Sequence, residues 1–140
     1  MVFLEVDENE HKGGNYTTLC DTTRMWNICS AEKLAGSGDK YILWIRLNPN
    51  TRFTIGDETH SPSNTVRCDA VCKVLNWIEG RENLPAMMVA YVCYQMDERC
   101  VPKILNDPDY REEVRPAVLG VKHCIGEDGT LDLEEITQIE

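Results

Sequence analysis

Two apolar runs in the middle of the chain dominate its hydrophobic pattern. The first covers 41–47 and contains one charged residue, Arg46, and the second covers 87–94 and contains none. Runs that are apolar on both alternating faces are typical of strands covered on both sides, as in parallel sheets. Asn48-Pro49-Asn50 follows the first run and predicts a turn.

The segment between the two runs predicts an amphipathic helix over 63–79. Ser61-Pro62-Ser63 offers capping oxygens and an early proline, and Gly80 follows the last turn. A stripe of apolar residues at helical spacing is expected to face the sheet. Its members are Cys68, Val71, Cys72, Leu75 and Ile78. A strand, a helix and a strand in this order predict a right-handed βαβ unit with parallel strands.

The segments before this unit carry weaker patterns. Alternation in 2–6 predicts an opening strand, and glycines in 12–15 predict a turn. The segment 16–34 is ambiguous, because its threonines favour a strand whereas Ala31-Glu32-Lys33-Leu34 favours a short helix that ends in the glycines of 36–39.

After the unit, short helices are expected near 101–105 and 109–115. Residues 117–121 predict a third core strand, which ends at Lys122-His123. The predicted fold is therefore α/β, a single domain over residues 1–140 with three layers and a mainly parallel central sheet.

Composition supports a globular chain of one domain. The 140 residues are 42% hydrophobic and 27% charged, which is typical of a packed core and not of disorder. The start turns acidic at once and does not resemble a secretory signal, and the longest apolar stretch, 86–94, is too short to span a bilayer. A cytoplasmic location is the expectation.

Seven cysteines, an odd number, argue against a disulfide framework. We expect them to be reduced, with Cys68, Cys72 and Cys93 buried as small hydrophobic groups. Cys68 and Cys72 with His60, or His123-Cys124, have the chemistry of zinc ligands, but structural zinc more often uses Cys-x-x-Cys knuckles. We therefore predict no metal and no cofactor.

The net charge of −10 is uneven along the chain. The segment 124–140 contains no basic residue; its acidic residues are Glu127, Asp128, Asp132, Glu134, Glu135 and Glu140. An acidic surface repels phosphate backbones, so the composition disfavours bulk binding of nucleic acid.

Topology nominates a ligand site, because ligands of such sheets bind beyond the carboxyl ends of the strands. This rule makes 48–51, 95–97 and His123 neighbours. Asn48 can hydrogen-bond within its own turn, which the spacing alone favours, or present its amide to a ligand.

Leu47-Asn48-Pro49 and Thr51, with Thr65 and Arg67 at the start of the helix, resemble the bacterial and phage family called domain of unknown function 1643. The family has a strand ending in Leu-Asn-Pro-Ser-Thr-Ala and then Asp-Pro-Thr-x-Arg opening a helix. The resemblance implies an α/β fold with a site around these residues.

The same strand and Asn-Pro turn are similar to the first motif of the mismatch-specific uracil-DNA glycosylases. That similarity implies that Asn48 holds a hydrolytic water and that a later histidine, His123, stabilises the departing base.

Four basic residues, Arg46, Arg52, His60 and Arg67, surround the predicted site in the sequence. Their side chains suit a phosphate or a carboxylate. The alternative is that they are solvated, some of them paired with Asp57 and Glu58.

The leading prediction is therefore recognition, extended to hydrolysis, of a nucleotide- or nucleobase-like ligand. Asn48 and His123 are the catalytic candidates; the ligand-binding candidates are Thr51, Arg52, His60, Thr65 and Arg67. The alternative is a non-enzymatic acidic interaction protein, such as a phage-type inhibitor or a nucleic-acid mimic, that binds a protein partner through 124–140.

Overall fold

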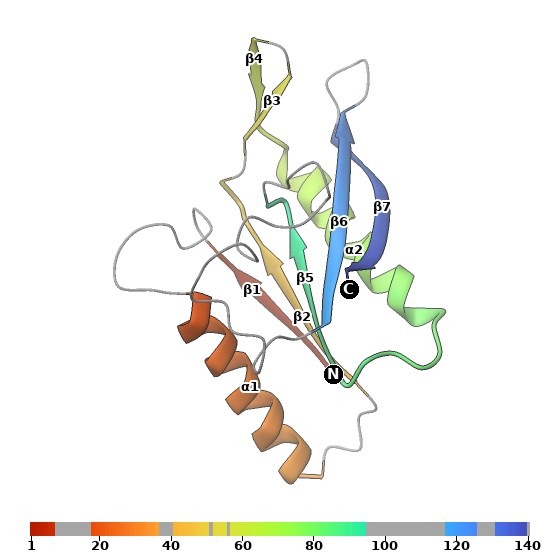
Figure 1. The fold of residues 1–140 in the computed structure, drawn as a ribbon. Helices are drawn as coiled ribbons and strands as arrows, with labels where there is room; N and C mark the ends of the chain where they lie inside the picture. Colours follow the sequence, from red (N-terminus) through yellow and green to blue (C-terminus); the bar gives the residue numbers. More distant parts are fainter. Residues whose placement is uncertain are drawn as a thin grey trace.

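The computed structural model describes residues 1–7, 18–36, 41–50, 52–55, 57–94, 117–125 and 131–139. Two helices and seven strands follow one another in these ranges (Figure 1). They are β1 Val2–Val6, α1 Thr18–Leu34, β2 Ile42–Leu47, β3 Phe53–Ile55, β4 Glu58–His60, α2 Asn64–Glu79, β5 Met87–Val92, β6 Ala117–Ile125 and β7 Leu131–Ile139.

One five-stranded sheet organises the fold, in the order β1-β2-β5-β6-β7. The first four strands are mutually parallel, and β7 pairs antiparallel with β6. The predicted α/β class and the parallel βαβ unit formed by β2, α2 and β5 are confirmed. β3 and β4 form a separate antiparallel hairpin. Neither described helix is long and apolar enough to cross a membrane.

The two helices pack on opposite faces of the sheet. Successive residues of a buried strand point to opposite sides, so each helix contacts a different, alternate set of strand side chains. Met25 and Cys29 of α1 pack with a set that includes Trp44 of β2. Val74 of α2 packs with the alternate set, which includes Ile45. This double cover explains why β2 and β5 are continuous apolar runs.

The buried stripe of α2 differs from the predicted one. Cys68 and Cys72 are exposed, so the prediction that they are buried is wrong. The residues of α2 that are buried are Arg67, Ala70, Val74 and Ile78. The helix is rotated by about one residue relative to the expectation, so that Arg67 and not Cys68 faces the sheet. Burial of Cys93 is confirmed, and no described cysteine side chain forms a disulfide.

The structure also changes the predicted elements near the two ends of the chain. The opening strand is β1, and the ambiguous 16–34 contains α1, which is followed by Gly36 with a φ of 74°. β6 does not end at Lys122-His123 but continues to Ile125, because β7 pairs along its whole length. Most of the acidic segment is thus the edge strand β7. The turn at 12–15 and the helices near 101–105 and 109–115 lie outside the described residues.

Candidate functional site

Three parallel strands end side by side at the carboxyl edge of the sheet. The Asp7 N–H donates to the Leu47 carbonyl at 2.8 Å, and the Asn48 N–H donates to the Val92 carbonyl at 3.0 Å. Asp7, Asn48 and Cys93 therefore stand at the same level, one after each of β1, β2 and β5. α2 begins at this edge, since it runs back along the sheet to reach the start of β5 (Figure 1).

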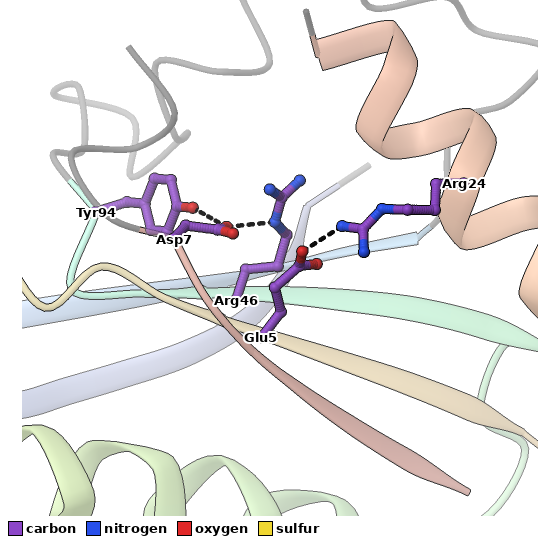
Figure 2. A network of polar contacts seen from close by, with 5 residues as sticks. All are labelled: Glu5, Asp7, Arg24, Arg46 and Tyr94. Atoms are coloured by element: carbon purple, nitrogen blue, oxygen red, sulfur yellow. Dashed lines mark hydrogen bonds and ion pairs between the residues drawn. The ribbon is translucent and has the colours of Figure 1, made fainter. Parts of the chain in front are cut away.

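A buried polar network occupies the α1 side of this edge (Figure 2). The Asp7 carboxylate accepts hydrogen bonds from Arg46 Nε and from the Tyr94 hydroxyl. Each of the three side chains is at most 1% exposed. The Tyr91 ring lies beside the guanidinium of Arg46, at 5.9 Å, and meets the Tyr94 ring edge-on. The network joins the ends of β1, β2 and β5.

The ionisation of this network is set by burial and by Asp7. Burial opposes the charge of Arg46, but the hydrogen bond and the attraction of Asp7 raise the pKa of its guanidinium above the ordinary value. Burial, helped by Asp7, raises the pKa of the Tyr94 hydroxyl. Arg46 therefore stays charged and Tyr94 stays protonated at neutral pH, which suits a structural ion pair.

Arg67 occupies the α2 side of the edge, in the first turn of the helix. It is 7% exposed. Its Nη1 donates to Asn64 Oδ1 at 3.3 Å and its Nη2 to Ser61 Oγ at 3.5 Å, and both acceptors are neutral. The buried Nε has no acceptor among the described residues. No carboxylate in the described part of the chain forms an ion pair with this guanidinium.

The helix terminus adds positive potential at the same place. Ser63 is the N-cap of α2, and its Oγ accepts from the Val66 N–H at 3.3 Å. The first turn contains no acidic residue. The N-terminal end of a helix favours anions and disfavours cations. A buried arginine in this turn is therefore electrostatically unfavourable unless an anion lies beside it.

Cys93 lies next to this positive region, directly after β5. Its φ of 60° is left-handed, a conformation that is uncommon for a residue with a side chain. Burial raises the pKa of the Cys93 thiol to about 11, and the charge of Arg67 opposes that rise. The thiol is therefore protonated at neutral pH and is not an activated nucleophile.

These environments predict a clear order of thiol reactivity. Alkylation with iodoacetamide at pH 8 should modify the exposed Cys68 and Cys72 in the folded chain. Cys29 and Cys93 are buried with raised pKa values, so they should react at least about tenfold more slowly, after local opening. Peptide mass spectrometry over time measures each rate. Fast modification of Cys93 would contradict its buried position.

Asn48, the central residue of the prediction, is 3% exposed. Its Oδ1 accepts a hydrogen bond from the Asn50 N–H at 2.9 Å. This bond closes an Asx turn, so the Asn-Pro turn that the spacing favoured is present. The catalytic role of Asn48 stays a prediction.

The other predicted residues spread around the edge. Phe53 pairs with His60 at the base of the β3–β4 hairpin, so Arg52, which is exposed, precedes that base and Ser61 follows it. His60 is half-buried. The base of the hairpin thus leads into the start of α2 (Figure 1).

The three remaining predicted residues are Thr65, Thr51 and His123. Thr65 is exposed in the first turn of α2, close to Arg67 in the sequence. Thr51 lies outside the described residues. His123 is inside β6, opposite Leu133 of β7, and not beyond the end of its strand as expected. Its side chain is outside the described part, so its role stays a prediction.

Sequence reasoning missed five residues that the structure places at this edge. They are Asp7, Ser61, Asn64, Cys93 and Tyr94. The signal that the sequence offers for them is their position, since each follows a strand or lies at the start of α2. Among the described residues, no group of three or more His, Cys, Asp or Glu could hold a metal ion.

No protein-family model, curated protein or solved structure matches this chain. The function of the site therefore rests on its own geometry.

Proposed function

We propose that the chain binds a small anionic ligand of the nucleotide class at the carboxyl edge of the sheet, with its phosphate held between Arg67 and the first turn of α2. One observation carries the proposal. Arg67 is 7% exposed, and its only partners among the described residues are two neutral oxygens. A buried cation at the positive end of a helix is an arrangement that an oxyanion would complete.

The energies favour an oxyanion over the present neutral partners. Taking an ion out of water costs several kcal/mol, and an effective partner must return that energy. The contacts of Arg67 at 3.3 and 3.5 Å are longer than the 2.7–2.9 Å that is typical of charge-assisted bonds. A phosphate oxygen could accept from Nε and from the free amides of the first turn without breaking a strong bond.

The nucleotide-like part of the proposal rests on position and on the Leu47-Asn48-Pro49 resemblance. In this proposal Asn48 orients the ligand or a water molecule at the end of β2, and Arg52 and His60 approach from the base of the hairpin. Hydrolysis with His123 as the group that stabilises a departing base is the further step. A cytoplasmic location fits a soluble nucleotide ligand and belongs to the same proposal.

Calorimetric titration tests the proposal through the phosphate group. We expect uridine monophosphate and inorganic phosphate to bind, and uridine, which has the same base and sugar, to bind at least about tenfold more weakly than its monophosphate. This expectation follows because one charge-assisted hydrogen bond contributes about 1.5–3 kcal/mol. Equal affinity for uridine and its monophosphate would show that Arg67 does not hold the phosphate.

One feature of the structure supports the alternative function, an acidic interaction protein. Asp132, Glu134 and Glu135 lie on β7, an edge strand of the sheet. Deleting 126–140 would remove this strand. It would also disturb the core, because Ile136 packs against the core on the α2 side. The matched test therefore replaces the three carboxylates by their amides. Loss of a captured protein partner with unchanged phosphate binding would favour the alternative.

A further inference from the structure

β1 forms one edge of the sheet (Figure 1). Its exposed apolar side chains form a row on one face. Val2 is 45% exposed, Leu4 58% and Val6 54%. They share the face on which α2 lies, because Phe3 and Glu5 point to the other face, toward Trp44 and α1. α2 packs over β2, β5 and β7. It leaves the side chains of β1 on this face exposed.

The backbone of the same three residues points outward. The Leu43 N–H donates to the Met1 carbonyl at 3.0 Å, and the Asp7 N–H donates to the Leu47 carbonyl at 2.8 Å. In a parallel ladder alternate residues bond to one neighbour. The odd-numbered residues of this strand therefore bond to β2. The N–H and C=O groups of Val2, Leu4 and Val6 face away from it.

β1 also lacks the features that usually protect an edge strand. Such strands often carry lysine, proline or an uncovered charge. The strand Val2–Val6 has one charged residue, Glu5, which forms an ion pair with Arg24 of α1. Asp7, which follows the strand, is bonded to Arg46. The edge is therefore apolar on one face and locally balanced in charge.

We propose that a second copy of this chain pairs with β1 in antiparallel fashion, with Leu4 on the two-fold axis. This register sets Leu4 opposite Leu4 of the second copy, and Val2 opposite its Val6. All of these residues have outward backbone groups, so each opposed pair exchanges two hydrogen bonds. Two apolar rows become one continuous row on one face of a sheet that extends through both copies.

Charge selects this register and limits the strength of the dimer. Glu5 lies opposite Phe3 of the second copy and not opposite another Glu5, which avoids a like-charge pair. Each chain carries −10 overall, so salt should strengthen the association by screening the general repulsion. One short strand buries less than the roughly 1,200–2,000 Å² of a stable interface, so we expect dissociation in the micromolar range.

Sedimentation equilibrium of the full chain, from about 1 µM to about 1 mM, tests the proposal. The mass should rise from 16.0 kDa toward twice that value, and further at higher salt. Leu4→Lys places two ammonium groups across the axis and should weaken dimerisation at least about tenfold. The matched control is Leu34→Lys, at the end of α1, where the leucine is 89% exposed. It should leave the dimer unchanged.

Hydrogen exchange on the unmodified chain keeps the test independent of any variant. The amide protons of Leu4 and Val6 should exchange slowly in concentrated solution and rapidly in dilute solution. Those of Phe3 and Glu5, which bond to β2, should be slow in both. A monomeric mass throughout, equal exchange of Leu4 at both concentrations, or a partner strand from another protein on a monomeric chain would overturn the proposal. Its outcome is independent of phosphate binding.

Discussion

Replacing Asp7 by asparagine is expected to lower the free energy of unfolding by about 3–5 kcal/mol. The amide has nearly the same shape as the carboxylate but no charge. Arg46 is 1% exposed and would keep its charge while losing the negative charge of its buried partner Asp7. The Tyr94 hydroxyl would also lose its charged acceptor. Urea denaturation, followed by circular dichroism, measures the difference.

Glu5→Gln is the matched control, because it makes the same chemical change two positions earlier on the same strand. The Glu5–Arg24 pair is partly solvated, with Arg24 46% exposed, so its loss should cost about 0–1 kcal/mol. The double variant Asp7→Asn with Arg46→Met removes both buried charges and should recover part of the loss. Equal effects of Asp7→Asn and Glu5→Gln would mean that the buried network does not stabilise the fold.

The central βαβ unit could be predicted because each of its elements shows its type in its own short stretch of sequence. A strand that is buried on both faces must be apolar at every position, and β2 and β5 are so except at Arg46. The capping residues Ser63 and Gly80 mark the ends of α2. α1 could not be predicted with the same clarity, because its threonines and its mixed polarity match no single period.

The orientation of α2 could not be predicted, and this affected the interpretation of the site. Counting Cys68 and Cys72 as core residues turned the expected buried face away from Arg67. The actual face is built on Ala70, Val74 and Ile78, and it places the arginine below the surface. The sequence of α2 contains two adjacent stripes at helical spacing, one that begins at Arg67 and one that begins at Cys68. Periodicity alone does not decide which of the two faces the sheet.

The Asp7 network was beyond sequence reasoning for a different reason. Asp7 lies 39 positions from Arg46 and 87 from Tyr94. These groups meet only because β1, β2 and β5 are neighbours in register. The order of strands in a sheet is a long-range property that the pattern of a single strand does not contain. The rule that ligands bind at carboxyl edges pointed to the edge where this network lies, but it could not name the pairs that form there.

Replacing Arg67 by methionine is expected to separate function from stability. The variant should lose at least about tenfold in affinity for inorganic phosphate, since it loses charge-assisted hydrogen bonds. Without ligand it should be as stable as the unmodified chain or more stable by about 1 kcal/mol. Methionine fills a similar volume without a buried charge, and the described partners of that charge are neutral. Thermal melting with and without phosphate measures both quantities.

Arg81→Met is the control on the opposite end of the same helix. Arg81 is exposed just beyond the end of α2, and its guanidinium lies 3.8 Å from the centre of the Trp77 ring. Its removal should leave phosphate binding intact and cost about 0.5–1 kcal/mol of stability. The two variants are therefore expected to give opposite results. Arg67→Met should lose the ligand without loss of stability, and Arg81→Met should lose stability without loss of the ligand. If Arg67→Met instead lowered the stability of the ligand-free chain by several kcal/mol, Arg67 would be a structural residue, and the phosphate site would have to lie elsewhere on the edge.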